Sequence, residues 1–340
     1  MGADLDPELV NLFASLGIPA SEIPTDLARQ IELASDAVLG RDDRYSVRDL
    51  AERFERDSGE LCMVLAEVGI RVYDLDEILF DDRDVELVGF VTAAADRFLA
   101  ENEGDEILNV IGSAVETIAE AAVASHVQGP ERRLERDRDG IALNRDMSEL
   151  GLLLGASLPM VFRHHLRQGA KRQRRTQNRD HRELVELSVG FVDLVGFTTL
   201  SQTKDPQALV AFVREFEGAA HDAAIRHDVR IAKLIGDEVM FVAESPNDAV
   251  AFATELLTTF STDGVVPRGG IACGSLITLH GDYFGPIVNL AARLVDHAVP
   301  AEVLVTEGVA ADVGDLAVPA GRRMLKGFAE PEAVWSIVSA

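Results

Sequence analysis

Two aspartates in the C-terminal half of the chain lie where apolar segments end, and their surroundings suit the binding of divalent cations. Asp193 ends the apolar run 184–194 and precedes Gly196, where the backbone can turn and approach a ligand closely. Asp237 follows Gly236 between two short apolar segments, which predicts a tight turn in a hairpin. Carboxylates at adjacent strand ends can hold two Mg²⁺ or Mn²⁺ ions, which activate an attacking hydroxyl and neutralise a triphosphate.

Four further polar residues accompany this pair. Lys233 lies four residues before Asp237, and Asp282 is followed by Asn289 and Arg293 at offsets of seven and eleven. Each residue alone is weak evidence, because turns with aspartate, surface lysines and Asn–Arg pairs one helical turn apart are all common. Their joint order and spacing supply metal ligands, a base reader, a ribose contact and a charge stabiliser. The set therefore predicts nucleotide chemistry.

The segments around these residues predict strands that alternate with covering helices. Asp205-Pro206 is a good helix start, because an acid caps the helix and proline fits its first position. Such interleaving is typical of an α/β or α+β sandwich. The expected strands are residues 184–194, 229–234, 239–243, 269–279 and 303–306, and the expected helices are residues 206–227, 246–260 and 287–297.

The chain up to about residue 165 has helical apolar spacing and no convincing alternating strand. Most of its helices need partners to bury their apolar faces, so we expect a helical bundle or disc. The segments with this spacing are residues 23–39, 47–54, 60–68, 84–99, 106–127 and 147–166.

Residues 46–54 and 59–69 resemble the two helices of a helix-turn-helix. A DNA-reading second helix presents Arg, Lys, Asn or Gln to bases and phosphates, whereas residues 59–67 hold no basic residue and two glutamates. The net charge of −26 also disfavours a nucleic-acid partner. Two packed structural helices are the default, and a salt-dependent DNA shift would support the alternative.

Length and composition indicate a globular, cytoplasmic protein. The chain has 340 residues, enough for two domains, and 47% of them are hydrophobic. Its two cysteines, Cys62 and Cys273, form no disulfide framework, which favours a reducing compartment. No signal peptide and no uninterrupted apolar run of about 18 residues is present, so no transmembrane segment is expected. The nearest run is residues 150–162.

A short basic strip separates two acidic parts. Residues 166–182 hold seven basic residues and one acidic residue, whereas residues 1–165 hold 35 acidic and 15 basic residues. The strip is polar throughout, so it is either a solvated linker or a switch segment that couples the two halves. We therefore expect a helical regulatory or dimerisation domain at 1–165, a linker at 166–182 and a catalytic domain at 183–340.

On the motifs quoted above, residues 184–340 resemble the catalytic domain of class III nucleotidyl cyclases, and all six positions match the adenylate-cyclase pattern. The resemblance implies an α+β fold, with a ferredoxin-like βαβ sandwich after the helical domain. The roles it implies are metal binding for Asp193 and Asp237, adenine recognition for Lys233 and Asp282, ribose orientation for Asn289, and stabilisation of the pentavalent phosphorus for Arg293. Leu325-Lys326-Gly327 matches the position of a triphosphate-binding lysine on three residues. Pro286 should stiffen a loop that varies in the family.

The resemblance implies conversion of ATP to 3′,5′-cyclic AMP and pyrophosphate by in-line attack of the ribose 3′-hydroxyl. Guanylate cyclases of the family typically carry Glu and Cys where this chain has Lys233 and Asp282, so ATP is expected over GTP. The family's site forms between two head-to-tail domains, so one domain with all six residues implies a homodimer with two sites. The alternative is an ATP-sensing regulator with a degenerate cyclase domain and an N-terminal helix-turn-helix DNA-binding module.

A helical domain, a basic connector and a cyclase domain resemble the soluble actinobacterial-type adenylate cyclases, whose N-terminal domain restrains the catalytic dimer. In the pH-sensing members, acid relieves this restraint. Histidines that could respond to acid are His164, His165, His181 and His280, although each can equally be an ordinary solvated histidine. Residues 150–162 could line a slot for a fatty acid or similar lipid, with plain dimer core as the default reading.

Overall fold

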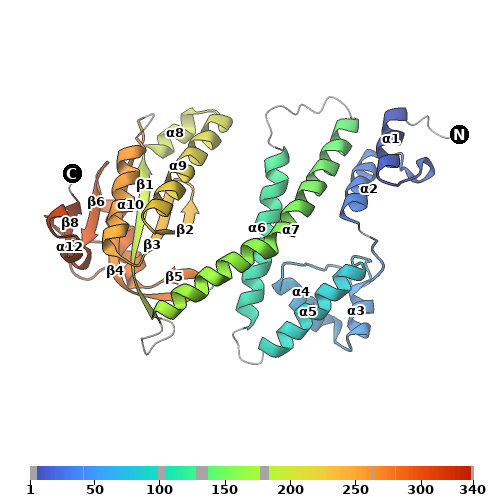
Figure 1. The fold of residues 1–340 in the computed structure, drawn as a ribbon, viewed down its shortest axis with the longest axis horizontal. Coiled ribbons are helices and arrows are strands. Elements are labelled where there is room, and N and C mark those ends of the chain that lie inside the picture. The colour runs from blue at the N-terminus through green and yellow to red at the C-terminus, as the bar shows by residue number, and fades with distance from the viewer. Residues whose placement is uncertain are drawn as a thin grey trace. The chain divides into compact units, whose positions relative to one another are not determined.

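The computed structural model describes residues 6–40, 42–98, 104–127, 137–176, 184–261, 264–279 and 281–337 (Figure 1). The chain divides into two compact units, Met1–Arg172 and Gln173–Ala340. The described part of the first unit consists of helices and their connections, and the second unit contains a sheet covered by helices. The α+β fold class predicted from the sequence is therefore confirmed.

All six helices expected in the first unit are present, with shifted ends. An additional helix, α1 (Pro7–Ser15), precedes them, followed by the 3-10 turn η1 (Ala20–Glu22). Asp6 caps α1, because its Oδ1 accepts a hydrogen bond of 2.9 Å from the backbone nitrogen of Glu8. The expected helices are α2 (Leu27–Leu39), α3 (Val47–Arg53), α4 (Ser58–Glu67), α5 (Asp82–Phe98), α6 (Gly104–Val127) and α7 (Asp137–Thr176).

Helices α3 and α4 pack together with α5. Ser46 and Asp49 form a capping box at the start of α3, in which each side chain bonds the backbone nitrogen of the other residue. Leu50, Leu61 and Leu65 are fully buried in the core that these helices share. The two helices therefore bury their apolar faces in a shared core, and no basic residue lies on α4.

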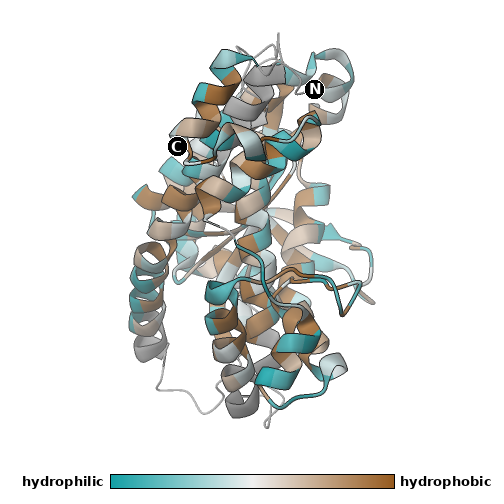
Figure 2. Cartoon of the chain, turned by 90° about the vertical axis from the view of Figure 1, so that its right-hand side faces the viewer, coloured by the Kyte–Doolittle hydropathy of each residue, from teal (hydrophilic) through white to brown (hydrophobic). Residues whose placement is uncertain are grey.

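Helices α6 and α7 keep many apolar side chains exposed within the described unit, among them Ile111, Leu153 and Phe162. The helices of the chain carry apolar and polar residues in alternating patches (Figure 2). One window, Ile107–Ala124, is long and apolar enough to cross a membrane, judged by length and composition alone. The expectation of no such segment rested on uninterrupted apolar runs, and Glu116 and Glu120 interrupt this one.

The second unit is built on an eight-stranded sheet. Seven strands follow the order β2-β3-β1-β4-β6-β8-β7, and the eighth, β5, pairs with β4. All pairs are antiparallel except β4 with β6. The strands are β1 (Leu184–Val195), β2 (Arg230–Ile235), β3 (Glu238–Ala243), β4 (Val266–Leu279), β5 (Asp282–Phe284), β6 (Val303–Thr306), β7 (Ala317–Arg323) and β8 (Glu332–Ile337).

Side chains alternate between the two faces of this sheet, as strand geometry requires. On β3, Val239 and Phe241 belong to one core, and Met240 and Val242 belong to the other. The first core is covered by helices α9 (Pro206–Arg226), α10 (Pro246–Thr259) and α12 (Glu307–Val313). Helix α11 (Pro286–His297) covers the second core, and the short helix α8 (Phe197–Thr203) follows β1.

Helix α11 lies unusually close to β4, and glycine permits this. A Cβ atom at Gly270 would lie 2.3 Å from the backbone nitrogen of Val295 and 2.6 Å from the carbonyl oxygen of Ala291. Any other residue here would therefore push α11 away from the sheet. Because Asn289 and Arg293 lie on α11, Gly270 helps to place both of them.

The sequence predicted the longest helices and strands of the second unit and missed several shorter ones. Strands β5, β7 and β8 and helices α8 and α12 were not expected; β5 spans three residues, and β7 mixes proline, glycine and arginine with small residues. Part of the expected linker 166–182 is helical, because α7 continues to Thr176. Residues 177–183, which include His181, and His280 lie outside the described residues.

Candidate active site

Asp193 lies near the end of β1, between two charged residues of the neighbouring strands. In the sheet register it faces Glu238 of β3 on one side and Arg268 of β4 on the other. Its Oδ2 accepts hydrogen bonds from Arg268 Nε at 2.9 Å and from Arg268 Nη2 at 2.7 Å. No local sequence signal marks Arg268, because its partner Asp193 lies 75 positions earlier in the chain.

Asp237 lies in the turn between β2 and β3, next to Gly236, whose φ of 64° suits glycine. Burial raises the pKa of the Asp237 carboxyl, and the negative charge of Asp193 adds to this effect. The structure therefore brings the two predicted metal-binding aspartates to one edge of the sheet.

Glu238, which the sequence analysis did not single out, adds a third acid to this edge. Burial raises its pKa to about 7, and the charges of Asp193, Asp296 and Asp237 contribute in the same direction, while Arg268 opposes them. We call Asp193, Asp237, Glu238 and Arg268 the acidic edge. Its carboxylates repel one another, and the single guanidinium only partly compensates for this.

The acidic edge fits part of a divalent-cation site. Within the described ranges, no cluster of three or more His, Cys, Asp or Glu side chains has the geometry of a complete metal site. Mg²⁺ commonly uses only one or two protein carboxylates and takes its other ligands from water and substrate phosphates. Asp237, whose ionised form is disfavoured by burial and by the charge of Asp193, therefore fits such a shared site, because a cation would offset both effects.

Lys233 and Asp282 form an ion pair between β2 and β5. The Asp282 side chain is one-fifth exposed, and its Oδ1 also accepts a hydrogen bond of 2.8 Å from the backbone nitrogen of Tyr283. The Arg230 guanidinium lies 4.8 Å from the centre of the Tyr283 ring, which adds a second contact between the two strands. We call Lys233 and Asp282 the Lys–Asp pair, and the structure brings both its members together.

Asn289 and Arg293 lie one turn apart on α11. Pro286 occupies the first turn of this helix after Gly285, so the expected stiffening of the loop takes the form of a helix start. Asn289 is exposed, and Arg293 Nη1 donates a hydrogen bond of 3.0 Å to Asp296 Oδ2. Both functional groups are therefore accessible from outside the chain.

Lys326 lies between β7 and β8 and is exposed, next to the buried Leu325. Among the described residues, no hydrogen bond or ion pair joins Lys326 to the other six positions. Within the described ranges, no hydrogen bond or ion pair joins the acidic edge to the Lys–Asp pair either. One chain thus presents two separate groups of predicted site residues, with α11 linked to the acidic edge through Arg268, whose Nη1 lies 3.2 Å from the carbonyl oxygen of Asp296.

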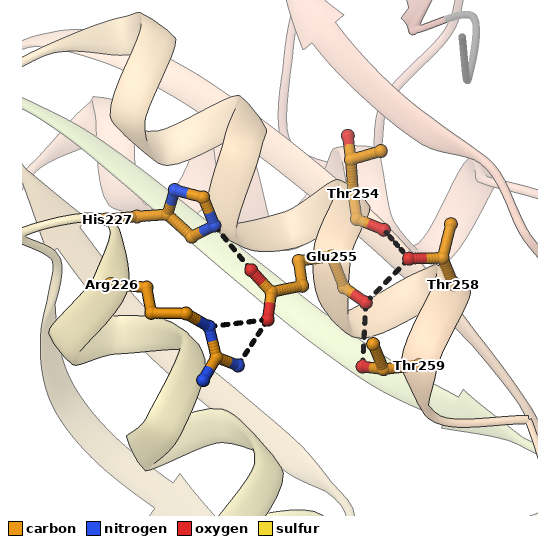
Figure 3. Close-up of polar contacts among 6 residues, drawn as sticks. All are labelled: Arg226, His227, Thr254, Glu255, Thr258 and Thr259. Atoms are coloured by element: carbon orange, nitrogen blue, oxygen red, sulfur yellow. Dashed lines mark hydrogen bonds and ion pairs between the residues drawn. The ribbon is translucent and has the colours of Figure 1, made fainter.

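A different polar cluster lies between α9 and α10 (Figure 3). Glu255 accepts hydrogen bonds from Arg226 and lies 2.6 Å from His227 Nε2, and hydrogen bonding to Arg226 lowers the pKa of its carboxyl. His227 and Glu255 line a surface pocket together with Asn247 and Thr254. No residue predicted from the sequence lies in this cluster, which ties the end of α9 to α10.

The chain is similar to proteins described as cyclases. The family described as "Adenylate and Guanylate cyclase catalytic domain" matches residues 180–316. An adenylate cyclase of Streptomyces griseus is 32% identical over 298 residues, which are 83% of this chain and 71% of that protein. A pH-sensitive adenylate cyclase of Mycobacterium tuberculosis is 28% identical over 297 residues, with 83% and 74% of the two chains covered.

Among solved structures, the adenylyl cyclase CyaB from P. aeruginosa superposes with a TM-score of 0.42 at 24% identity, covering 46% of this chain and 96% of that one. The family match lies in the unit that carries the acidic edge and the Lys–Asp pair, and the similarity to the Streptomyces enzyme extends through most of the chain. The chain therefore belongs to the class III family of adenylate and guanylate cyclases.

Proposed function

We propose that the protein is an adenylate cyclase that converts ATP to 3′,5′-cyclic AMP and pyrophosphate. The observation that carries the proposal is the Lys233–Asp282 ion pair in a domain of this family. Relatives named adenylate cyclase, at 32–38% identity, support the same activity.

The Lys–Asp pair is complementary to adenine. The adenine edge offers an N6 amino donor beside a ring-nitrogen acceptor, and it therefore needs one acceptor and one donor from the protein. Asp282 supplies the acceptor, and Lys233 supplies the donor. Guanine presents a carbonyl oxygen where adenine has its amino group, so the carboxylate of Asp282 would face another acceptor. This difference favours ATP over GTP.

Asp193 and Asp237 are proposed to hold two Mg²⁺ or Mn²⁺ ions. When bound, the ions would activate the ribose 3′-hydroxyl and neutralise charge on the triphosphate. The two aspartates would orient this chemistry, since Asp193 lies near the end of β1 and Asp237 lies in the turn before β3, which pairs with β1. Asn289 would hold the ribose, Arg293 would stabilise charge on the α-phosphorus, and Lys326 would bind the triphosphate. Much of the catalysis would then come from positioning and charge stabilisation.

The separation of the two groups supports a site shared between two chains. The acidic edge of one chain would meet the Lys–Asp pair, Asn289 and Arg293 of a second copy, which gives a homodimer with two equivalent sites. The described residues of one chain show no contact that closes this site alone. The relevant assembly would involve both domains.

Cyclic AMP formation from ATP and from GTP, with Mn²⁺ or Mg²⁺, tests the activity. We expect product from ATP and little from GTP. A mixture of an Asp193→Ala chain with an Arg293→Ala chain tests the shared site, because each variant is expected to be inactive alone while the mixed dimer regains one intact site. Product from either variant alone at the wild-type rate would contradict the assignment, and its absence from the mixture would contradict the shared site.

The helical unit is proposed to regulate the catalytic dimer, with domain limits at 1–165, 166–182 and 183–340. Helix α7 supports this, because it runs from the helical unit through His164 and His165 into the basic strip. Protonation of these exposed histidines would add charge to an already basic segment. The test is the pH profile of the full-length protein against its His164→Gln, His165→Gln and His181→Gln variant, which we expect to lose its response to acid; an unchanged profile contradicts this mechanism.

A lipid remains the second proposed regulator of the helical unit. The exposed apolar residues of α7, such as Leu153 and Met160, support either a lipid slot or a dimer core. Native mass spectrometry of the purified protein distinguishes them, because a bound fatty acid adds a defined mass and a dimer core adds none. A cytoplasmic location also stays a prediction.

A further inference from the structure

Arg268 connects the acidic edge to the helix that carries Asn289 and Arg293. Its Nε and Nη2 both bond Asp193 Oδ2, at 2.9 and 2.7 Å. Its Nη1 donates to the carbonyl oxygens of Asp296 and Ala298, at 3.2 and 3.3 Å, where α11 ends. The Arg268 side chain is about three-quarters buried, with an exposed fraction of 24%, so these contacts lie in a protected position.

Each contact matches a chemical need of its partner. The last carbonyl groups of a helix have no partner inside the helix and carry partial negative charge, and a guanidinium there is therefore favourable. On the other side, both nitrogens bond one oxygen of Asp193, so Oδ1 accepts nothing from Arg268. Only arginine has a rigid fork that can serve both partners, because lysine presents a single nitrogen.

The sheet register and the packing of α11 hold Arg268 beside both of its partners. Arg268 lies on β4 opposite Asp193 in the sheet register, and Gly270 brings α11 against the same strand. A shift of the Arg268 side chain would therefore displace either the Asp193 carboxylate or the end of α11. Catalytic groups lose effectiveness when displaced by as little as about 1 Å.

We propose that Arg268 is a positioning residue that serves both active sites of the dimer at once. It fixes Asp193 for the site to which its own chain supplies the metal-binding carboxylates. It also fixes the end of α11, and through it Asn289 and Arg293, for the site to which its chain supplies those residues. This inference rests on the proposed function and its shared site.

The first test is the full-length Arg268→Met variant, with Arg268→Lys to retain the charge. Loss of a group that orients a metal ligand typically costs about 10–100-fold in activity. We expect a fall of at least this size in kcat, because every site of this dimer loses both contacts, together with a KM for ATP within about threefold of the wild type and little rescue by lysine, since lysine has no fork. The matched control is Arg226→Met, which removes another arginine–carboxylate pair in the same unit, outside the proposed site. Equal kcat values for Arg268→Lys and the wild type would overturn the proposal.

Mixed dimers separate the two roles, because a mixture of Asp193→Ala and Arg293→Ala chains holds only one intact site. Arg268→Met placed in the Arg293→Ala chain tests the contact to Asp193, and we expect about a 10–100-fold loss. Placed in the Asp193→Ala chain, it tests the contact to α11 alone, and we expect about a three- to tenfold loss. A loss in only one placement, or in neither, would overturn the two-site role. No product from the parent mixture would instead refute the shared site of the proposed function, and the two-site role with it.

A measurement without metal or substrate completes the test. In hydrogen exchange on the full-length, metal-free protein, the amide of Ala298 and the other amides that close the last turn of α11 should exchange about tenfold faster in Arg268→Met than in the wild type. Arg226→Met should leave them unchanged. Unchanged exchange in Arg268→Met would show that Arg268 does not hold the helix end, and it would overturn the proposal whatever the activity.

Discussion

The two charged groups of the catalytic unit differ in how well the chain balances their charges. The Lys–Asp pair combines one cation with one anion, and its members already contact each other. The acidic edge combines three acids with one arginine, and burial together with mutual repulsion raises the pKa of Glu238 to about 7. The first group is therefore electrostatically balanced in one chain, whereas the second carries an excess of negative charge that a bound cation would offset.

This difference explains why the two groups should respond differently to substitution. Removing a member of a balanced pair leaves its partner charged and unpaired, which costs stability as well as specificity. Removing an acid from a crowded set relieves repulsion, so stability can rise while function is lost.

The largest expected effect comes from removing a metal-binding carboxylate. Asp193→Ala and Asp237→Asn should each lower cyclic AMP formation by at least on the order of 10³-fold, because the metal ions would lose a ligand. In the metal-free protein, Asp237→Asn should raise the melting temperature, since the folded state holds the pKa of this carboxyl above its usual range and so disfavours its ionised form. Glu215→Gln, at an exposed acid of α9, is the control. A catalytically intact Asp237→Asn enzyme would remove the contrast between the two groups.

The next effect concerns substrate choice. Lys233→Glu combined with Asp282→Cys should lower kcat/KM for ATP by about 10²–10³-fold and raise the ratio of kcat/KM for GTP to that for ATP, because groups placed to hydrogen-bond one base discriminate strongly against another. Initial rates with both nucleotides measure it. The single Lys233→Ala variant should lose activity with ATP without gaining activity with GTP. An unchanged nucleotide preference in the double variant would mean that the pair does not read the base.

A smaller effect is the pH dependence of stability at the acidic edge. The folded-state pKa of Glu238, about 7, lies above its ordinary value of 4.5, so ionisation is unfavourable in the folded protein. The unfolded state releases this proton first, and metal-free stability therefore falls as the pH rises from about 4.5 through 7. Glu238→Gln should raise the melting temperature at pH 8 by roughly 2–6 °C and change it little at pH 5. An equal shift at both pH values would contradict this origin.

The smallest effect is expected at the Arg226–Glu255 pair. The Arg226 side chain is more than half exposed, so Arg226→Met should change stability by less than about 1 kcal/mol. Cyclic AMP formation should stay within about twofold of the wild type, because no proposed site residue contacts the pair. Thermal unfolding and initial rates measure both quantities. A large loss of activity would extend the functional region to α9 and α10.

The sequence predicted the long elements because their signals are local. Apolar spacing marked α2 to α7 and β1 to β4, and the six site residues stood out through short intervals such as that between Lys233 and Asp237. It missed β5, which has three residues, and it also missed α1 and β8, which are at least as long as the predicted α3 and β2, so length alone does not decide which elements the sequence reveals. The site residues themselves were predicted in type, but their contacts were not. For Glu238, the sequence showed only a second acid after Asp237, with no measure of its burial.

The sequence by itself determined the succession of helices and strands and the chemical types available at each turn and strand end. Hydrophobic periodicity and short-range spacing carry that information along the chain. Only the tertiary structure decided that Arg268 would bond Asp193, that Lys233 would meet Asp282, and that Glu238 would be buried among acids. Strand register and helix packing set these contacts, because they bring together residues whose separation in the sequence has no periodicity to read.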